Sequence, residues 1–448
     1  MSQTAHDFHI TTLGPCGIPS PQKMSSVDGD FIANWVTDDE RVLVHIHSCP
    51  GVPMGVTNSF EKAGPRARIF FSPADVHAAI VTCGGLCPGL NDVIRAIVFN
   101  LEYRYGVRRI SGIRFGYRGL IDGIMDEPIP LNAALVNDIH NRGGTILGSS
   151  RGNGDRAGEI VDTLERRGIH ILFTLGGDGT QRGAMGIAEE IARRNLPIAV
   201  VGVPKTIDND IAFADRSFGF ESAVASAVTA ISAAHVEALG APSGIGLVKV
   251  MGRHSGFIAA HATLAMNDVD FVLIPEVPFE LDGPNGFLAH LEMRVKKRGH
   301  AVVLVAEGAG QHLVAGGGHT DASGNAVLGD VGLFLKDCIP AWFAQQGAEV
   351  NLKYIDPSYI IRATPANAND SLLCARLGGA AVHAAMCGRT KMLVNILHNQ
   401  FVHIPIEVAV SRRNQVNPDG DLWRDVVEAT GQPPLMRNDR PSLLSYNL

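Results

Sequence analysis

Short β-branched runs that alternate with amphipathic segments dominate the sequence from Val76 onward. The runs AAIVTCGG, IHILFTLGG and IAVVGVPK are each followed by a segment with the apolar period of a helix, and the alternation recurs from GIGLVKVMG to AVVLVAEGAG. This pattern predicts parallel sheets with helices on both faces. Because open sheets rarely exceed about ten strands, we expect the 448 residues to form two α/β units rather than one.

The two ends of the chain lack this alternation. Residues 1–75 carry recurrent Pro-Gly signals and one short alternating run, RVLVHIH, that predicts a strand. We interpret them as an N-terminal extension. After the apolar run VHIPIEVAV, we interpret residues 413–448 as a peripheral C-terminal tail.

The composition argues against several classes of partner. A net charge of −7, a pI near 6.2 and the lack of a long Lys/Arg block disfavour nucleic acid. Seven scattered cysteines, an odd number, favour thiols in a reducing compartment over a disulfide framework. The N-terminus has no signal-peptide pattern, and no stretch reaches the roughly 18 apolar residues that span a bilayer. We therefore expect a cytoplasmic protein without nucleic-acid or membrane partners.

Polar residues and glycines gather where the predicted strands end. Ligands bind outside the carboxyl ends of the strands of an open parallel sheet, so these residues are expected at one edge. Glycines at a strand-to-helix turn let backbone N–H groups approach an anion, which favours a phosphate at the helix N-terminus. A lone carboxylate there, in GGDGT, is suited to hold Mg²⁺ against that phosphate. The residues concerned are Gly84–Gly85, Asp178, Lys205–Asp210, Met251–Arg253 and Glu307.

PKTIDND is the strongest single motif. It places Asp208 and Asp210 beside Thr206 and Lys205 directly after a buried strand, whereas a simple turn needs only one such carboxylate. A carboxylate near a cation and a hydroxyl substrate suits a general base, and a second carboxylate raises its proton affinity.

Each of the remaining motifs is open to a functional interpretation and to an ordinary structural one. GGDG by itself is more often an ordinary loop, and the CxxxC spacing in TCGGLCPG is more often a pair of packing thiols than a metal site. Arg253, and Arg362 with Tyr359, suit bidentate binding of a phosphorylated substrate, although a solvated arginine is the commoner case. RGGTILGSSRG, with Arg151, suits nucleotide phosphates or a tight turn. The sequence contains no GxxxxGK[ST], GxSxG or HExxH motif.

Taken together, the ordered motifs resemble those of the 6-phosphofructokinase family, in particular its longer ATP-dependent subgroup of plants and trypanosomatids. They are TCGGLCPGLNDVIRAIV, RGGTILGSSRG, LGGDGTQRGA, PKTIDNDI, KVMGRHSGFIAAHATLA, VAEGAGQ and DPSYIIRATPANAND. The resemblance implies an α/β fold of two Rossmann-like parallel-sheet domains of phosphofructokinase type, with the site in the cleft. It implies an N-terminal extension (1–75), a nucleotide-binding domain (76–219, completed by about 364–412), a sugar-phosphate-binding domain (220–363) and a C-terminal tail (413–448).

The resemblance also implies a reaction: transfer of the ATP γ-phosphoryl to the 1-hydroxyl of fructose 6-phosphate, with Mg²⁺, in glycolysis. Asp208 resembles the base, Thr206 and Arg253 resemble further catalytic residues, and Asp178 resembles the magnesium residue. Lys205 is added to the catalytic residues as a cation near the transferring phosphoryl. The implied sugar-phosphate contacts are Thr206, Ile207, Asp208, Met251, Gly252, Arg253, Glu307, Tyr359 and Arg362. The implied nucleotide contacts are Gly85, Arg151, Gly152, Gly177, Asp178, Gly179 and Thr180. A homo-oligomer, tetramer or dimer, and allosteric control are further expectations.

The chain departs from the family pattern in two places. Lys205 stands where short bacterial enzymes have glycine and is shared with pyrophosphate-dependent enzymes, but Gly179 stands where those enzymes usually have a second aspartate. A carboxylate at position 179 would repel the inner phosphate of a nucleotide, so we expect ATP rather than pyrophosphate. Gly244 stands where the short enzymes have an arginine that reaches a neighbouring subunit. Cross-subunit phosphate binding by that residue is therefore not expected.

Other functions are alternatives. The runner-up is a pyrophosphate-dependent phosphofructokinase, with or without sedoheptulose 7-phosphate as a further substrate. A catalytically silent regulatory member is disfavoured because Asp178, Asp208 and Arg253 are all present. A diacylglycerol or NAD kinase shares a GGDGT-like loop but does not require PKTIDND and MGR.

Overall fold

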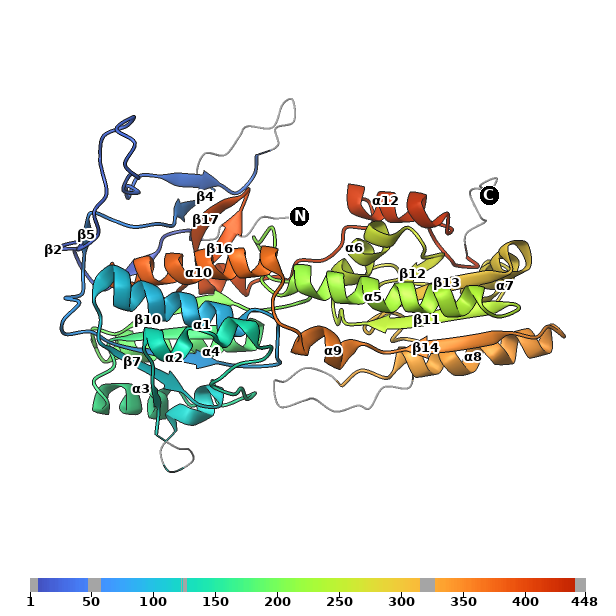
Figure 1. The fold of residues 1–448 in the computed structure, drawn as a ribbon, viewed down its shortest axis with the longest axis horizontal. Helices are drawn as coiled ribbons and strands as arrows, with labels where there is room; N and C mark the ends of the chain where they lie inside the picture. The colour runs from blue at the N-terminus through green and yellow to red at the C-terminus, as the bar shows by residue number, and fades with distance from the viewer. Residues whose placement is uncertain (1–6, 47–57, 122, 124–126, 315–326, 440–448) are drawn as a thin grey trace. The chain divides into compact units, whose positions relative to one another are not determined.

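The chain divides between two α/β units in the computed structural model, which describes residues 7–46, 58–121, 123, 127–314 and 327–439. Unit 1 comprises Met1–Thr206, Ile211–Gly219 and Ala363–Arg413, and unit 2 comprises Ile207–Asp210, Phe220–Arg362 and Asn414–Leu448. Figure 1 labels many of the helices and strands of both units. The expected class of two α/β units with parallel sheets is confirmed, whereas the functional names of the two domains stay predictions.

A nine-stranded sheet organises unit 1. Its strands from β16 to β7 run parallel, and both edges are antiparallel. The central strands are the buried runs AVVGVP, ILFTLG and HAAIVT, as the alternation predicts. In order, the strands are β3 (Arg41–Leu43), β4 (Ser59–Lys62), β17 (Gln400–Pro405), β16 (Met392–Leu397), β10 (Ala199–Pro204), β9 (Ile171–Gly176), β6 (His77–Thr82), β7 (Arg109–Ile113) and β8 (Ile129–Pro130).

Helices cover both faces of this sheet. The helices α1 and α10 lie side by side (Figure 1), and they approach so closely that a Cβ at Gly378 of α10 would lie 2.6 Å from Cβ of Ala96 in α1. The helical segments of unit 1 are α1 (Leu90–Phe99), the π-helix η1 (Asn100–Tyr105), η2 (Gly116–Leu120), α2 (Ala133–Val136), η3 (Ile139–Asn141), α3 (Ala157–Arg166), α4 (Asp178–Arg193), α10 (Ala368–Met386) and α11 (Ile406–Ala409).

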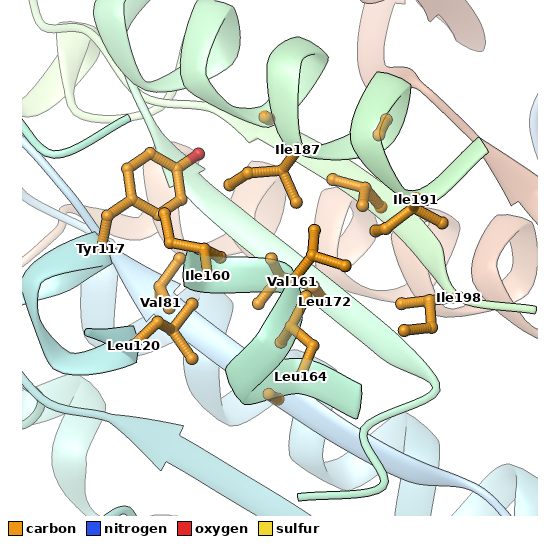
Figure 2. Packing of buried hydrophobic residues seen from close by; sticks show 14 of the residues in the cluster. Val81, Tyr117, Leu120, Ile160, Val161, Leu164, Leu172, Ile187, Ile191 and Ile198 are labelled. Carbon is orange, nitrogen blue, oxygen red and sulfur yellow. The ribbon is translucent and has the colours of Figure 1, made fainter. Parts of the chain in front are cut away.

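The core under α3 and α4 holds the strand ends in place. Figure 2 shows Val81 and Leu172 of the sheet packed with Ile160 of α3 and Ile187 of α4. These side chains alternate with residues that face the other side, so each strand is buried on both faces. Tyr117 lies at one end of the cluster and is fully buried.

The N-terminal extension joins the same sheet rather than remaining irregular. Strand β4 pairs with β17, and β3, at the predicted run RVLVHIH, pairs with β4. Buried Glu61 accepts hydrogen bonds from Arg66 at 3.0 Å, Arg389 at 2.5 Å and His403 at 3.1 Å, and so links the extension to the strands that follow α10. A small sheet of β1 (Thr11–Thr12) with β15 (Arg389–Thr390) adds to this link, whereas β2 (Ile18–Pro19) pairs with β5 (Arg68–Ile69) inside the extension.

A four-stranded parallel sheet organises unit 2. Its order is β12 (Phe271–Leu273), β13 (His300–Ala306), β11 (Gly244–Val250) and β14 (Asn351–Ile355). One face is covered by a core from α7 (Phe287–Arg298) and α8 (Val331–Gln345). The other helices of unit 2 are α5 (Phe220–Leu239), α6 (Phe257–Met266), α9 (Ser358–Ala363), whose last residue falls in unit 1, and α12 (Asp421–Thr430).

Residues 414–439 supply structure that the interpretation as a tail did not include. The segment DLWRDVVEAT forms amphipathic α12, which packs on α6 through buried Trp423 and Val426. Gln432 then accepts a 2.6 Å hydrogen bond from Val272 N of β12. Residues 440–448 of the predicted tail lie outside the described residues.

One described helix, α5, passes a length and hydropathy test for a membrane span, which the sequence analysis did not anticipate. It packs on β11, β13 and α6 within unit 2. A single such helix is weak support for a span, because core helices of soluble domains pass the same test.

Candidate active site

The turns after β6 and β9 lie at a topological switch point of unit 1. In the order β10–β9–β6–β7, the chain leaves β6 for β7 on one side and later enters β9 on the other. Open α/β sheets bind ligands at the carboxyl ends of strands at such a point. Gly84–Gly85 follow β6 and Gly177–Thr180 follow β9, so two predicted glycine turns lie at adjacent strand ends.

The GGDGT turn converts a buried strand directly into a helix. Gly176 ends β9, Gly177 is the N-cap of α4, and no side chain caps that helix. A side chain at Gly176 is excluded because its Cβ would lie 2.2 Å from Oγ1 of Thr180. The carbonyl of buried Thr180 accepts a 2.7 Å hydrogen bond from the Tyr117 hydroxyl, which joins the turn to the core. An uncapped helix start of this kind presents N–H groups suited to a phosphate.

Gly179 differs from its neighbours in the turn. It lies in α4, and a Cβ there would meet no atom within 4 Å. Gly177 has less room, since its Cβ would lie 3.3 Å from the Lys205 carbonyl oxygen. Local packing and backbone conformation therefore do not require glycine at position 179. A bound ligand is the remaining reason for a glycine there.

Asp178 is the first residue of α4, where a carboxylate also interacts favourably with the helix dipole. Its Oδ2 accepts a hydrogen bond from Arg182 at 3.2 Å and lies 3.8 Å from Arg413, two arginines that the sequence analysis missed. Among the described residues, no group of three or more His, Cys, Asp or Glu side chains could hold a metal. The donor set therefore fits Mg²⁺ that is held mainly by substrate phosphates and water, with Asp178 as one carboxylate.

The loop with Arg151 runs alongside the end of β6. Gly84 N–H donates to the Ser150 carbonyl at 2.9 Å, and the Ser149 hydroxyl donates to the Gly84 carbonyl at 2.7 Å. Arg151 and Gly152 follow and are exposed, and Gly152 has a positive φ of 78° that glycine adopts without strain. The structure thus brings RGGTILGSSRG and TCGGLCPG together, although their spacing in the sequence gives no sign of it.

Lys205 is buried at the same edge. It is 7% exposed, and its Nζ donates a 2.7 Å hydrogen bond to the Gly85 carbonyl. Gly84, with φ of +86°, leaves space for this ammonium, because a Cβ there would lie 3.3 Å from Nζ. The predicted cation therefore lies against the glycine turn after β6. Thr206 is partly buried and its carbonyl accepts a 2.5 Å hydrogen bond from Ser217.

Asp208 lies beside the MGR turn within unit 2. Its Oδ2 accepts a hydrogen bond from the Arg253 backbone N–H at 3.4 Å, and its carbonyl accepts one from Ser255 at 2.8 Å. Ile207 before it is buried, and Asn209 after it is buried in a left-handed conformation with φ of 55°. The sharp backbone path of TIDN therefore fixes Asp208 against the residues that follow β11.

The MGR and AEG turns interlock at the carboxyl ends of β11 and β13. Gly308 N–H donates to the Gly252 carbonyl at 3.1 Å, and a Cβ at Gly308 would lie 2.0 Å from the Arg253 carbonyl oxygen. Gly252 has φ of +127°, and its Cβ would lie 2.6 Å from the Ser255 carbonyl oxygen. Backbone contact thus brings Glu307 next to Arg253. Met251 is partly buried just before them.

The electrostatics of this group centre on Glu307. Burial raises the pKa of Glu307, while the positive charges of Arg253, Lys249 and Arg362 oppose that rise. Arg362 also lies over the ring of Tyr359, with Cζ 4.8 Å from the ring centroid. Tyr359 is 77% exposed on α9. Three of the predicted sugar-phosphate residues of unit 2, Glu307, Arg253 and Arg362, therefore interact electrostatically.

Sequence reasoning missed Lys249 in this group. The available signal was a charged residue inside an apolar strand, GIGLVKV. Gly244, at the start of that strand, is required by packing, because a Cβ there would lie 2.0 Å from the Ala238 carbonyl oxygen. An arginine cannot occupy position 244 on this backbone.

A pocket of about 360 Å³ in unit 1 contains none of the candidate residues. Its lining includes Asp92, Arg95, Tyr103, Arg104, His140 and Ser371.

Known proteins similar to this chain carry related names. The chain is 58% identical to the "ATP-dependent 6-phosphofructokinase" of Borreliella burgdorferi, over 96% of this chain and 98% of that protein. It is 48% identical to the enzyme of the same name from Trypanosoma cruzi, over 95% and 88% of the two chains. It is 46% identical to "ATP-dependent 6-phosphofructokinase 5, chloroplastic" of Arabidopsis thaliana, over 92% and 80%.

Structural and family comparisons agree. The crystal structure of the pyrophosphate-dependent phosphofructokinase of Marinobacter aquaeolei has a TM-score of 0.64, with 21% identity over 79% of this chain and 91% of that chain. At that identity the likeness concerns the fold alone. The Phosphofructokinase family description matches residues 77–385. The chain therefore belongs to the phosphofructokinase family.

Proposed function

We propose that this chain is an ATP-dependent 6-phosphofructokinase that converts fructose 6-phosphate to fructose 1,6-bisphosphate in glycolysis. The observation that carries the proposal is the grouping of Asp208, Arg253 and Glu307 at the strand ends of unit 2. Identities of 46–58% over nearly the full chain to enzymes named for this activity support it.

The residues of unit 2 are assigned to the sugar phosphate and the base. Asp208 accepts the proton of the 1-hydroxyl as that oxygen bonds to the γ-phosphorus, the bond to the β-phosphate oxygen breaks, and ADP leaves. A positioned general base contributes about 10²–10⁴-fold to such a step. The proposed sugar-phosphate contacts are Ile207, Met251, Gly252, Arg253, Glu307, Tyr359 and Arg362. Thr206, the residue directly before Ile207, is a further proposed contact.

The residues of unit 1 are assigned to the nucleotide. The start of α4 and its glycines bind phosphate through backbone N–H groups, and Arg151 and Gly85 extend that contact. Mg²⁺, held in part by Asp178, neutralises charge on the phosphates when bound. Lys205 adds a fixed, buried cation at the adjacent strand end.

Two residues bear on the phosphoryl donor in opposite ways. Gly179 keeps a carboxylate away from the start of α4, where the inner phosphate of ATP would bind, and the room around it supports ATP. Lys205 suits either donor, because it is a cation hydrogen-bonded to a glycine turn. We assign ATP as the donor.

The test compares initial rates on fructose 6-phosphate with ATP and with pyrophosphate, each with and without Mg²⁺. We expect activity with ATP and Mg²⁺, and no activity after chelation. Activity with pyrophosphate alone would overturn the donor assignment and the nucleotide roles of Arg151 and Gly152. Activity with neither donor would overturn the proposed reaction.

Assembly and location are part of the proposal. We assign a homo-oligomer, tetramer or dimer, which light scattering of the purified chain tests. We also assign the cytoplasm, on the scattered cysteines, which form no disulfide among the described residues. Cell fractionation tests that location.

A further inference from the structure

Lys249 is a charged residue inside the central strand of unit 2. It lies one residue before the end of β11, and its side chain is only 12% exposed. By strand alternation it lies on the same face as Leu247, which packs in the core with α8. A nearly buried ammonium is costly unless it is paired, so its partners matter.

Two aspartates bind this ammonium: Asp330 is the N-cap of α8, and Asp356 accepts a hydrogen bond from the first residue of α9. Asp330 places Oδ2 3.0 Å from Lys249 Nζ, and its Oδ1 accepts a 3.0 Å hydrogen bond from Leu333 N at the start of α8. Asp356 places Oδ2 2.9 Å from Nζ, and its Oδ1 accepts a 3.1 Å hydrogen bond from Ser358 N at the start of α9. One lysine therefore links the first turns of two helices to the end of β11.

The residues packed around Lys249 leave space for its side chain to reach both aspartates. Gly332 lies in the first turn of α8, and a Cβ there would lie 2.9 Å from Lys249 Cδ and 2.4 Å from the Tyr354 hydroxyl. Tyr354 lies on β14 two residues before Asp356, and Ile355, the last residue of β14, pairs with Val248 of β11. Glycine at position 332 gives the lysine stem its path to the two carboxylates.

The electrostatic environment of Lys249 also indicates a role in linking the two aspartates. Burial lowers the pKa of Lys249, but hydrogen bonds with Asp356 and Asp330 outweigh it and raise the pKa well above its usual range. The ammonium is therefore kept in its charged form by the two carboxylates that share it. Two of its three N–H donors are engaged by these carboxylates and the side chain is only 12% exposed, which favours a supporting role over direct phosphate binding.

We infer that Lys249 is a positioning residue for the sugar phosphate. It holds α9 through Asp356, and α9 carries Tyr359 and Arg362. Lys249 also neutralises Asp330 and Asp356, which would otherwise repel a phosphorylated substrate. The expected effect on sugar-phosphate binding rests on the proposed function. The link from Lys249 through Asp356 to α9 rests only on contacts within unit 2.

The experiment compares Lys249→Met, Lys249→Arg and Asp356→Asn in the full-length chain, with Lys353→Met as control. Lys353 is an exposed lysine on β14, so its loss removes a charge without removing the link. For Lys249→Met we expect KM for fructose 6-phosphate to rise at least about tenfold, since small misplacements of binding groups cost up to about 10²-fold. KM for ATP and kcat should stay within about threefold of the parent, and Lys249→Arg should restore most of the affinity.

A double-mutant cycle separates positioning from direct binding. If Lys249 acts through Asp356, KM for fructose 6-phosphate in the double variant should be no higher than in the single variant with the larger rise. Additive effects, or tighter sugar-phosphate binding in Asp356→Asn, would overturn the inference, as would an unchanged KM in Lys249→Met. If Lys249→Met does not fold, Lys249→Arg and Asp356→Asn alone decide, because Asp356→Asn should then raise KM by a similar factor.

Hydrogen exchange distinguishes failure of this inference from failure of the proposed function. Amides of residues 358–363 should exchange faster in Lys249→Met than in Lys353→Met, whatever the substrate is. Faster exchange without any fructose 6-phosphate turnover in the parent would overturn the function but not the link. Unchanged exchange would overturn the link.

Discussion

Glycines have different roles among the candidate site residues of unit 1 and among those of unit 2. In unit 1, Gly179 lies in a helix where an added Cβ would have no atom within 4 Å, so neither packing nor backbone demands glycine. In unit 2, a Cβ at Gly308 would lie 2.0 Å from a backbone oxygen, so glycine is needed for two turns to interlock. A glycine with room around it points to a ligand, whereas a glycine without room points to packing.

The charged residues of the two groups also differ. In unit 1, backbone N–H groups of α4 and one buried lysine face the expected phosphates. In unit 2, Asp208, Arg253 and Glu307 are held by backbone contacts, and Lys249 links the end of β11 to α9 through Asp356. In the proposed assignment, the nucleotide group is therefore built mainly from backbone N–H groups, and the sugar-phosphate group mainly from side chains.

The largest expected effect is in unit 2. Asp208→Asn should lower kcat by roughly 10²–10⁴-fold, because the amide cannot accept the hydroxyl proton. KM for fructose 6-phosphate should change little, since the amide keeps the size of the carboxylate. Steady-state kinetics check this, with Asp337→Asn, an exposed position on α8, as the matched control. A kcat that survives the change would remove Asp208 from its role.

The next largest effect is in unit 1. Gly179→Asp should raise KM for ATP by roughly 10–10²-fold, because a like charge near a phosphate costs on the order of 1–4 kcal/mol. Folding should not suffer, since the site has room and a carboxylate near a helix start is favourable.

The control for this change is Gly186→Asp, the same substitution in α4 at a second glycine with open space. Titration of the rate with ATP measures both variants. Equal losses in the two would mean that position 179 has no special relation to the nucleotide.

A third prediction tests the packing role of glycine in unit 2. Gly308→Ala should lower the free energy of unfolding by about 1–3 kcal/mol, because the backbone of Arg253 must move away from the new methyl group. Gly179→Ala should change that free energy by less than about 0.5 kcal/mol or increase it slightly. Urea unfolding of both variants measures the difference, and similar losses would contradict the contrast between the two glycines.

The smallest expected effect concerns pH. Burial raises the pKa of Glu307 in the folded state despite the opposing charges of Arg253, Lys249 and Arg362. Its contribution to stability is therefore full below the ordinary glutamate pKa and is lost as pH rises through the folded-state value. Glu307→Gln should remove that slope, so the variant should be more stable than the parent at pH 7 but bind fructose 6-phosphate less well.

Thermal unfolding between pH 4 and pH 8 tests this difference. The control is Glu349→Gln, an exposed position before β14, which should leave the slope as it is in the parent. A Glu307→Gln chain that is less stable at pH 7 would show that the carboxylate stabilises the fold.

The alternation of β runs and amphipathic helices, read along the chain, was enough to predict two α/β units with parallel sheets. It also placed the GGDGT, MGR and AEG residues at strand ends, because parallel strands share one carboxyl edge. It did not predict that Arg41–Leu43 and Ser59–Lys62 add strands to the sheet of unit 1, since these strands are short and join that sheet only where β4 pairs with distant β17. It did not predict α12 either, which is a short helix with one apolar face.

By itself, the sequence determined the periodicity of each element and the chemical identity of the residues after each strand, because both are local properties of the chain. Only the tertiary structure decided which glycines have room around them and which partners Lys249 and Glu61 bind. Those facts depend on residues that lie far apart in the chain: Lys249 binds Asp330 and Asp356, and Glu61 binds Arg389 and His403. Pairings at such separations follow from how the sheets and helices pack, which no local pattern records.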